Sequence, residues 1–263
     1  MLPPFFYDNY YLIVKWKDNI YFVLVEPREA GNIGASARAI KNMGFKNLCL
    51  VNPGSPISDE ARWFAHNALD VLQAMKVYDN LLDAISDKSL VVGTTRRKGK
   101  KRGAVLPVED VAARLLDMAP DKKIAVLFGR EDRGLFNEEI EECDLLLTIP
   151  TAKEQPSLNL AQAVMIVAYE LLKADGKNGC SKRTGKKGPL TYLLEHGELT
   201  FLYGRISKIL RLLGYIPRGD KDLEKKIMLN VKQLAVRKGL AEWELQMLHG
   251  ICSQIEKKLR EKD

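Results

Sequence analysis

The feature that most constrains the fold is a repeated alternation between short, continuous apolar runs and longer segments of helical period. Typical apolar runs are residues 20–26 (IYFVLVE), 47–52 (NLCLVN) and 123–128 (KIAVLF). A strand that is apolar at every position, rather than at every second one, is buried on both faces, as strands of a parallel sheet are. Because helical segments separate the runs, the sequence predicts an α/β fold: a parallel sheet with helices on both faces.

The remaining predicted elements complete this alternation. We expect strands also at 76–78, 89–93 and 145–149, and helices at 33–43, 59–75, 81–85, 108–118, from Asn137 onwards and from Ser157 to 172. Asn137 is expected to cap its helix, whose first turn is acidic at Glu138 and Glu139. In open parallel sheets, ligands bind where the carboxyl ends of the strands meet. The unusual loops of this sequence all leave the carboxyl ends of predicted strands, so we expect the functional site there.

A second, smaller domain is predicted at the C-terminus. Residues 173–189 (KADGKNGCSKRTGKKGP) are rich in glycine and basic residues and are typical of a linker. Residues 190–263 then carry amphipathic helical patterns without a predicted strand, which indicates a small all-α domain. The predicted organisation is therefore an N-terminal extension (1–19), the sheet domain (20–172), a basic linker and the helical domain.

The positive charge of the chain is concentrated in two places. The formal net charge is +7 at pH 7, yet six basic residues lie between Arg96 and Arg102 and six more in the predicted linker. Such a distribution favours a polyanion partner, although two solvated surface loops are the alternative. The residues of the first loop expected to bind the phosphates of such a partner are Arg97, Lys98, Lys100, Lys101 and Arg102.

Several classes of protein are disfavoured. No run of about 18 uncharged apolar residues is present, so no membrane partner is expected. The four cysteines form no CxxC pair, which fits a reducing cytoplasm and argues against zinc. The HExxH, EF-hand, GxSxG, GxGxxG and complete P-loop patterns are missing, so hydrolase, metal-dependent and ordinary nucleotide-binding functions are weakly supported.

Three loops carry the residues best suited to chemistry. The first loop is 26–38 (EPREAGNIGASAR), in which Gly31 and Gly34 allow a close backbone approach at a helix start. Arg38 is six residues after Asn32, so the two side chains lie on different faces of the predicted helix. The second loop is 128–134 (FGREDRG).

The third loop, 149–160 (IPTAKEQPSLNL), precedes a helix that we expect Ser157 to cap, with Asn159 in its first turn. One interpretation is a capped core helix. The other is a pocket around the helix N-terminus, in which Ser157 and Asn159 face a sugar.

The three loops together resemble a known family. NIGASARAIKNMGF, LFGREDRGL and SLNLAQAV are similar to motifs 1, 2 and 3 of the SPOUT superfamily of RNA methyltransferases, in the branch that methylates ribose 2′-hydroxyls. The whole chain resembles the TrmJ family of tRNA methyltransferases. This resemblance implies a deep trefoil knot, S-adenosylmethionine as the methyl donor, and a homodimer with the site at its interface. It also implies that nucleotide 32 of the tRNA anticodon loop, a cytidine or also a uridine, is the target.

The resemblance also implies a role for each site residue. Arg38 would lie at the target hydroxyl, Asn32 would orient it, and Ser157 and Asn159 would lie beside the ribose. The implied donor-binding residues are Thr94, Thr95, Arg96, Gly129, Glu131, Ile149, Pro156, Ser157 and Leu158.

An arginine side chain has a pKa above about 12 in water and is a poor base. We therefore expect Arg38 to orient the hydroxyl and to stabilise developing negative charge. No metal is required by this chemistry.

Three alternatives remain open. The target could be another tRNA or rRNA site, the protein could bind RNA on the same scaffold without catalysis, or it could be a nucleotide-cofactor enzyme of the open α/β type. Intact Arg38, Ser157 and Asn159 argue against the second, and the missing GxGxxG argues against the third.

Overall fold

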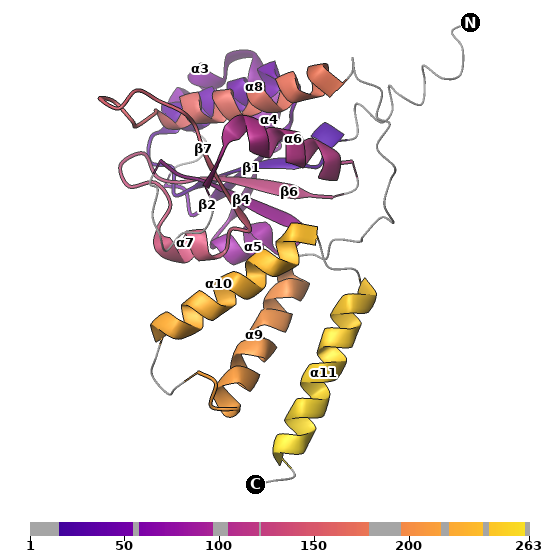
Figure 1. The fold of residues 1–263 in the computed structure, drawn as a ribbon. Coiled ribbons are helices and arrows are strands. Elements are labelled where there is room, and N and C mark those ends of the chain that lie inside the picture. Colours follow the sequence, from indigo (N-terminus) through magenta and orange to yellow (C-terminus); the bar gives the residue numbers. More distant parts are fainter. Residues whose placement is uncertain are drawn as a thin grey trace, which may run out of the picture. The chain divides into compact units, whose positions relative to one another are not determined.

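The protein divides into two compact units, Met1–Thr184 and Gly185–Asp263, with the division inside the predicted linker. The computed structural model describes residues 16–54, 58–96, 105–120, 122–178, 196–216, 221–238 and 242–260 (Figure 1). Helix α8 (Leu160–Asn178) continues without interruption into the segment predicted as linker, 173–189. The exact domain limits therefore stay a prediction.

The first unit contains a seven-stranded sheet in the order β3-β2-β1-β6-β4-β7-β5. Every pair of neighbouring strands is parallel. The strands are β1 (Ile20–Val25), β2 (Asn47–Val51), β3 (Lys76–Tyr78), β4 (Leu90–Thr94), β5 (Val105–Pro107), β6 (Ile124–Phe128) and β7 (Leu145–Thr148). The predicted parallel α/β architecture is thus confirmed.

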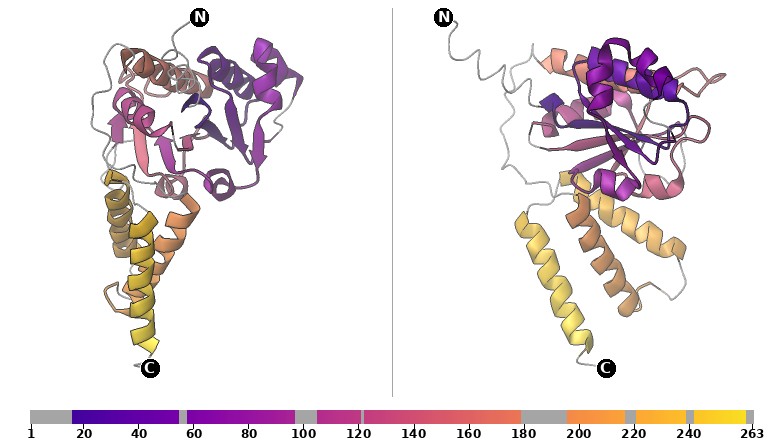
Figure 2. Two further views of the ribbon diagram at one scale, coloured as in Figure 1. Left: turned by 90° about the vertical axis from the view of Figure 1, so that its right-hand side faces the viewer. Right: turned by 180° about the vertical axis from the view of Figure 1, so that it is seen from behind.

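Helices cover both faces of the sheet. On one face lie α2, α6 and α8, with α3 and α4 packed against α2, whereas α5 and α7 lie on the other (Figures 1 and 2). Besides α8, the helices are α2 (Ala30–Asn42), α3 (Asp59–Ala65), α4 (Leu69–Gln73), α5 (Leu81–Ile85), α6 (Val108–Met118) and α7 (Asn137–Glu141), with a 3-10 turn, η1 (His66–Ala68), before α4.

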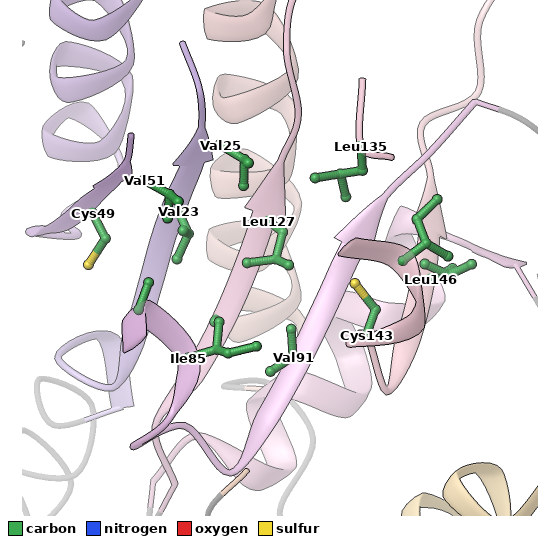
Figure 3. Close-up of a cluster of buried hydrophobic side chains, with 13 residues drawn as sticks. Val23, Val25, Cys49, Val51, Ile85, Val91, Leu127, Leu135, Cys143 and Leu146 are labelled. Carbon is green, nitrogen blue, oxygen red and sulfur yellow. The ribbon is translucent and has the colours of Figure 1, made fainter. Parts of the chain in front are cut away.

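The continuous apolar runs are explained by this double cover. Successive side chains of a strand point to opposite faces, so both sets must be apolar when both faces are covered. Val23 and Val25 of β1 join Ile85 of α5 in the cluster on one face (Figure 3), while Phe22 and Leu24 lie on the other and are 0% exposed. The central strands are therefore specified by burial rather than by alternation.

The strand order departs from the chain order at two points. Strand β6 lies between β1 and β4, and β7 lies between β4 and β5, so each occupies a position between strands made earlier. This order is compatible with the trefoil knot that the family resemblance implies. The knot itself stays a prediction.

Some predicted boundaries were wrong. The helix predicted over 59–75 is interrupted at His66, whose φ of 48° is left-handed and cannot continue an α-helix. Helix α2 begins at Ala30 rather than at Ile33, and Gly44 (φ 76°) follows its end. The edge strand β5 was not predicted.

In the described parts of the second unit, all regular secondary structure is helical. It contains α9 (His196–Leu212), α10 (Lys221–Lys238) and α11 (Glu242–Arg260). Leu202, Tyr203 and Leu245 belong to its apolar core, and Arg205 forms an ion pair with Glu256 at 2.9 Å. Across the described parts of both units, no helix combines the length and apolarity needed to span a bilayer.

Candidate active site

A pocket of about 130 Å3 lies where the carboxyl ends of β4, β6 and β7 meet. Every residue predicted to bind the donor lines it. They come from three places: Thr94 at the end of β4, with Thr95 and Arg96 after it; Gly129 and Glu131 after β6; and Ile149, Pro156, Ser157 and Leu158 between β7 and α8. Residues that are distant in sequence therefore line one pocket, at the carboxyl ends of the strands, where ligands of parallel sheets bind.

The loop after β6 is closed by its own backbone. The amide of Gly134 donates to the carbonyl of Arg130 at 2.8 Å, and the amide of Arg130 donates back at 3.3 Å. A Cβ at Gly129 would lie 2.1 Å from the carbonyl carbon of Gly134, so only glycine fits there. Gly134 has a φ of 68°, which also favours glycine.

Glu131 connects this loop to the start of α2. Its carboxylate accepts the backbone amides of Arg28 and Glu29 at 3.3 Å and the side-chain amide of Asn32 at 3.0 Å. Asp132 adds an ion pair with Arg28 at 2.9 Å. A carboxylate is favourable at a helix N-terminus, where amides lack partners. Motif 2 is thus held against motif 1 by hydrogen bonds within a single chain.

Asn159 connects the third loop to the same group. Its Nδ2 donates to Oδ1 of Asn32 at 2.8 Å, while its Oδ1 accepts the amide of Ala161 at 2.9 Å. The prediction that Ser157 caps α8 is therefore wrong, because Asn159 occupies that position. Gln162 accepts the amide of Asn159 at 3.3 Å, which completes a reciprocal capping box that the sequence N-L-A-Q could have indicated.

Ser157 itself is exposed and lines the pocket. Asn32 and Asn159 lie outside its lining but are joined to Glu131, which belongs to it. Three of the four predicted catalytic residues are thus in or next to the pocket.

Arg38, the fourth, does not line the pocket of the single chain. It lies on α2 with an exposed side chain, and no hydrogen bond or ion pair joins it to another described residue. Ser36, two positions earlier, is fully buried, so Ser36 and Arg38 lie on different sides of the helix. Gly34 provides the predicted close approach, but to helix α3: a Cβ there would lie 2.0 Å from the carbonyl oxygen of Ala61.

Arg130 also lines the pocket, although it was not among the predicted site residues. Its side chain is 3% exposed and forms ion pairs with Glu26 at 2.8 Å and Glu139 at 3.0 Å. Burial alone would lower the pKa of Arg130, but the hydrogen bonds that its guanidinium donates to Glu26 and Glu139 outweigh this effect and raise the pKa. The hydrogen bond from Arg130 in turn lowers the pKa of Glu26. The expected helix cap at Asn137 was wrong, since Phe136 occupies the N-cap of α7.

The predicted RNA-binding residues Arg97, Lys98, Lys100, Lys101 and Arg102 lie outside the described residues. Within the described part of the chain, no group of three or more His, Cys, Asp or Glu side chains is arranged to hold a metal ion.

Comparison with known proteins gives a consistent result. Residues 19–169 match the SpoU rRNA Methylase family. The tRNA (cytidine/uridine/adenosine-2′-O-)-methyltransferase TrmJ of Pseudomonas aeruginosa is 34% identical over 249 residues, covering 92% of this chain and 96% of that protein. The tRNA (cytidine-2′-O-)-methyltransferase TrmJ of Methanocaldococcus jannaschii is 38% identical over 163 residues, covering 60% and 70% respectively.

Among solved structures, TrmJ from Z. mobilis ZM4 superposes with a TM-score of 0.73 at 28% identity, covering 90% of this chain and 98% of that one. The similarity to the TrmJ proteins therefore extends from the sheet domain into the helical C-terminal unit. The chain belongs to the SpoU methylase family and, within it, to the TrmJ methyltransferases.

Proposed function

We propose that this protein transfers a methyl group from S-adenosylmethionine to a ribose 2′-hydroxyl of tRNA, at nucleotide 32 of the anticodon loop. The observation that carries this proposal is the convergence of the donor-binding residues implied by the family resemblance on one pocket. The hydrogen-bonded series Glu131–Asn32–Asn159 adds support, because it brings residues of all three motifs to the rim of that pocket.

The chemistry of the pocket fits the proposed donor. Leu135, Leu158 and Leu160 supply apolar surface for an adenine ring, and Thr95, just after β4, supplies a hydroxyl group for a ribose. The carboxylate of Asp132 is paired with Arg28 and Arg133, whereas that of Glu131 accepts hydrogen bonds from amides and can attract a ligand with a sulfonium and an ammonium group.

The roles of this chain's own residues follow from that arrangement. When bound, S-adenosylmethionine supplies an electrophilic methyl group. Ser157, exposed at the pocket, is placed to position the ribose, while Asn32 and Asn159 hold the motif 1 and motif 3 helix starts together. Arg38 would donate hydrogen bonds to the 2′-oxygen of the target ribose. These would stabilise the negative charge that develops on this oxygen as the hydroxyl proton leaves for solvent or an RNA phosphate.

This mechanism requires a second copy of the chain. Arg38 is exposed and outside the pocket of its own chain, so we propose that it completes the pocket of a partner in a homodimer. The position on α2 supports this, because Arg38 lies about 9 Å along the helix from Asn32.

The base at the target nucleotide is the finer part of the proposal. The names of the two relatives differ, one including uridine and adenosine and the other cytidine alone. We propose cytidine, with uridine as a second substrate base. Mass-spectrometric mapping of methylated riboses in tRNA treated with the protein tests this directly, and modification of a different tRNA or rRNA position would redirect the proposal.

S-adenosylhomocysteine should bind the purified protein and raise its unfolding temperature, since a ligand at 100 times its Kd stabilises the folded state by about 2.7 kcal/mol. Isothermal calorimetry and a thermal shift assay measure this. NAD and ATP serve as matched controls for the alternative nucleotide-cofactor function. A shift with either control and none with S-adenosylhomocysteine would reject the proposed donor.

We also expect the dimer to be built by the sheet domain. A shortened chain that ends at Asn178, the last residue of α8, should remain dimeric in light scattering, because the partner contact proposed for Arg38 lies within this part. A monomer of the shortened chain, with a dimer of the full chain, would instead assign dimerisation to the helical unit.

A further inference from the structure

We propose that Arg130 is a positioning residue for the donor pocket. Its buried guanidinium fixes the loop after β6. In this position, Gly129 packs against the backbone of Gly134, and Glu131 binds Asn32. This inference rests on the proposed function, because it treats the pocket as the donor site.

The contacts of Arg130 use the whole guanidinium group. Nε and Nη2 each lie 2.8 Å from the carboxylate of Glu26, while Nη1 and Nη2 lie 3.1 and 3.0 Å from that of Glu139. Its carbon Cζ stacks over the ring of Phe136 at 3.8 Å. The planar fork of an arginine suits two bidentate carboxylates, which a lysine ammonium cannot reproduce.

These contacts anchor the loop on one side, and Glu131 anchors it on the other. Glu26 follows β1 and Glu139 belongs to α7, so Arg130 ties the loop to two elements that precede and follow it. Glu131, the next residue, binds the start of α2 through Arg28, Glu29 and Asn32. Adjacent residues of opposite charge therefore hold the loop from two directions.

The loop has little freedom between these anchors. Gly129 is in contact with the backbone of Gly134 and Leu135, and the hydrogen bonds between Arg130 and Gly134 close the turn. A change in the position of Arg130 would be transmitted to both sides of the turn, including the part that lines the pocket.

The guanidinium is already committed to two carboxylates, so it is a poor receptor for the carboxylate of a ligand. Neither Glu26 nor Glu139 lines the pocket. An effect of Glu139 on donor affinity must therefore pass through Arg130 or Phe136. A substitution of Glu139 therefore tests whether the position of the loop affects donor affinity, without removing a side chain that contacts the donor.

The test compares Glu139→Gln, Arg130→Met and the double variant in the full-length protein. Calorimetry measures affinity for S-adenosylhomocysteine, and steady-state kinetics measures KM for the donor and for tRNA. We expect Glu139→Gln to weaken binding about tenfold and Arg130→Met to weaken it more, a scale typical of groups coupled in one network. The double variant should be no weaker than Arg130→Met alone.

If Arg130 had a purely structural role, the variants would yield less folded protein, and the folded fraction would bind the donor like wild type. The positioning role predicts a raised donor KM, a kcat at saturating donor within about twofold of wild type, and an unchanged KM for tRNA. Arg114→Met, an exposed arginine on α6, is the matched control and should bind like wild type.

The outcomes distinguish the proposals. Wild-type affinity in a folded Glu139→Gln variant would overturn the positioning role, and the donor site would stand. If Arg130→Met loses donor binding while Glu139→Gln binds like wild type, Arg130 contacts the donor directly and the positioning role is wrong. If Arg130→Met does not fold, Glu139→Gln decides by itself. Failure of the wild-type protein to bind S-adenosylhomocysteine would overturn both this inference and the proposed donor.

Discussion

Arg38→Ala is expected to reduce the methylation rate at saturating tRNA by roughly 10²-fold or more, with tRNA affinity nearly unchanged. This is the scale observed when one donor to a developing negative charge is removed. The exposed side chain of Arg38 has no described partner in its own chain, so its loss should not destabilise the fold. Single-turnover kinetics, combined with a measured Kd for tRNA, separates the two quantities.

The matched control is a variant in which Lys100, Lys101 and Arg102 are neutralised together. It should weaken tRNA binding and flatten the salt dependence, since each phosphate contact contributes about 0.7–0.9 to the log–log slope. Its rate at saturation should change much less. If Arg38→Ala behaves like this control, Arg38 is a phosphate contact and the catalytic assignment is wrong.

Gly34→Ala should cause a large loss of stability, of about 3 kcal/mol. The new Cβ would lie 2.0 Å from the carbonyl oxygen of Ala61 and 2.9 Å from the amide nitrogen of Ala65. Both are backbone atoms of α3, so relief requires the two helices to move apart. Thermal unfolding of the full chain measures the effect, with an expected decrease in Tm of roughly 6–12 °C.

Gly176→Ala gives the opposite expectation and serves as its control. Gly176 lies on α8, and a Cβ there meets no atom within 4 Å. Alanine should therefore stabilise the helix by up to about 1 kcal/mol, the usual difference in helix propensity. Equal effects of the two substitutions would show that helix propensity, rather than the α2–α3 contact, determines the result at Gly34.

The strands of the sheet could be predicted because burial on both faces leaves a direct trace in the sequence. Residues 20–25 and 124–128 are apolar at almost every position, and they became the central strands β1 and β6. Strand β5 left no such trace. It has three residues at the sheet edge, ends in Pro107, and is determined by pairing with β7.

The residues that share the pocket could be predicted where they depend on loop sequence, and were missed where they depend on tertiary contacts. Ser157 and Asn159 are both good helix caps, and the choice between them involves the hydrogen bond to Asn32, 127 residues away. Arg130 has no local signal, because its partners Glu26 and Glu139 come from two other elements. The left-handed backbone at His66 likewise ends a helix that periodicity alone would continue.

The strand order has a consequence for how the protein is made. On one side of β1, all neighbouring pairs contain β6 or β7, so β4 and β5 have no sheet partner until residues 124–148 have left the ribosome. The loops that line the pocket are synthesised with these same strands. A nascent chain that stalls earlier would leave the backbone N–H and C=O groups along one edge of β1 and along β4 unpaired, and such edges promote aggregation. The sheet therefore becomes continuous only after β6 and β7 have been translated.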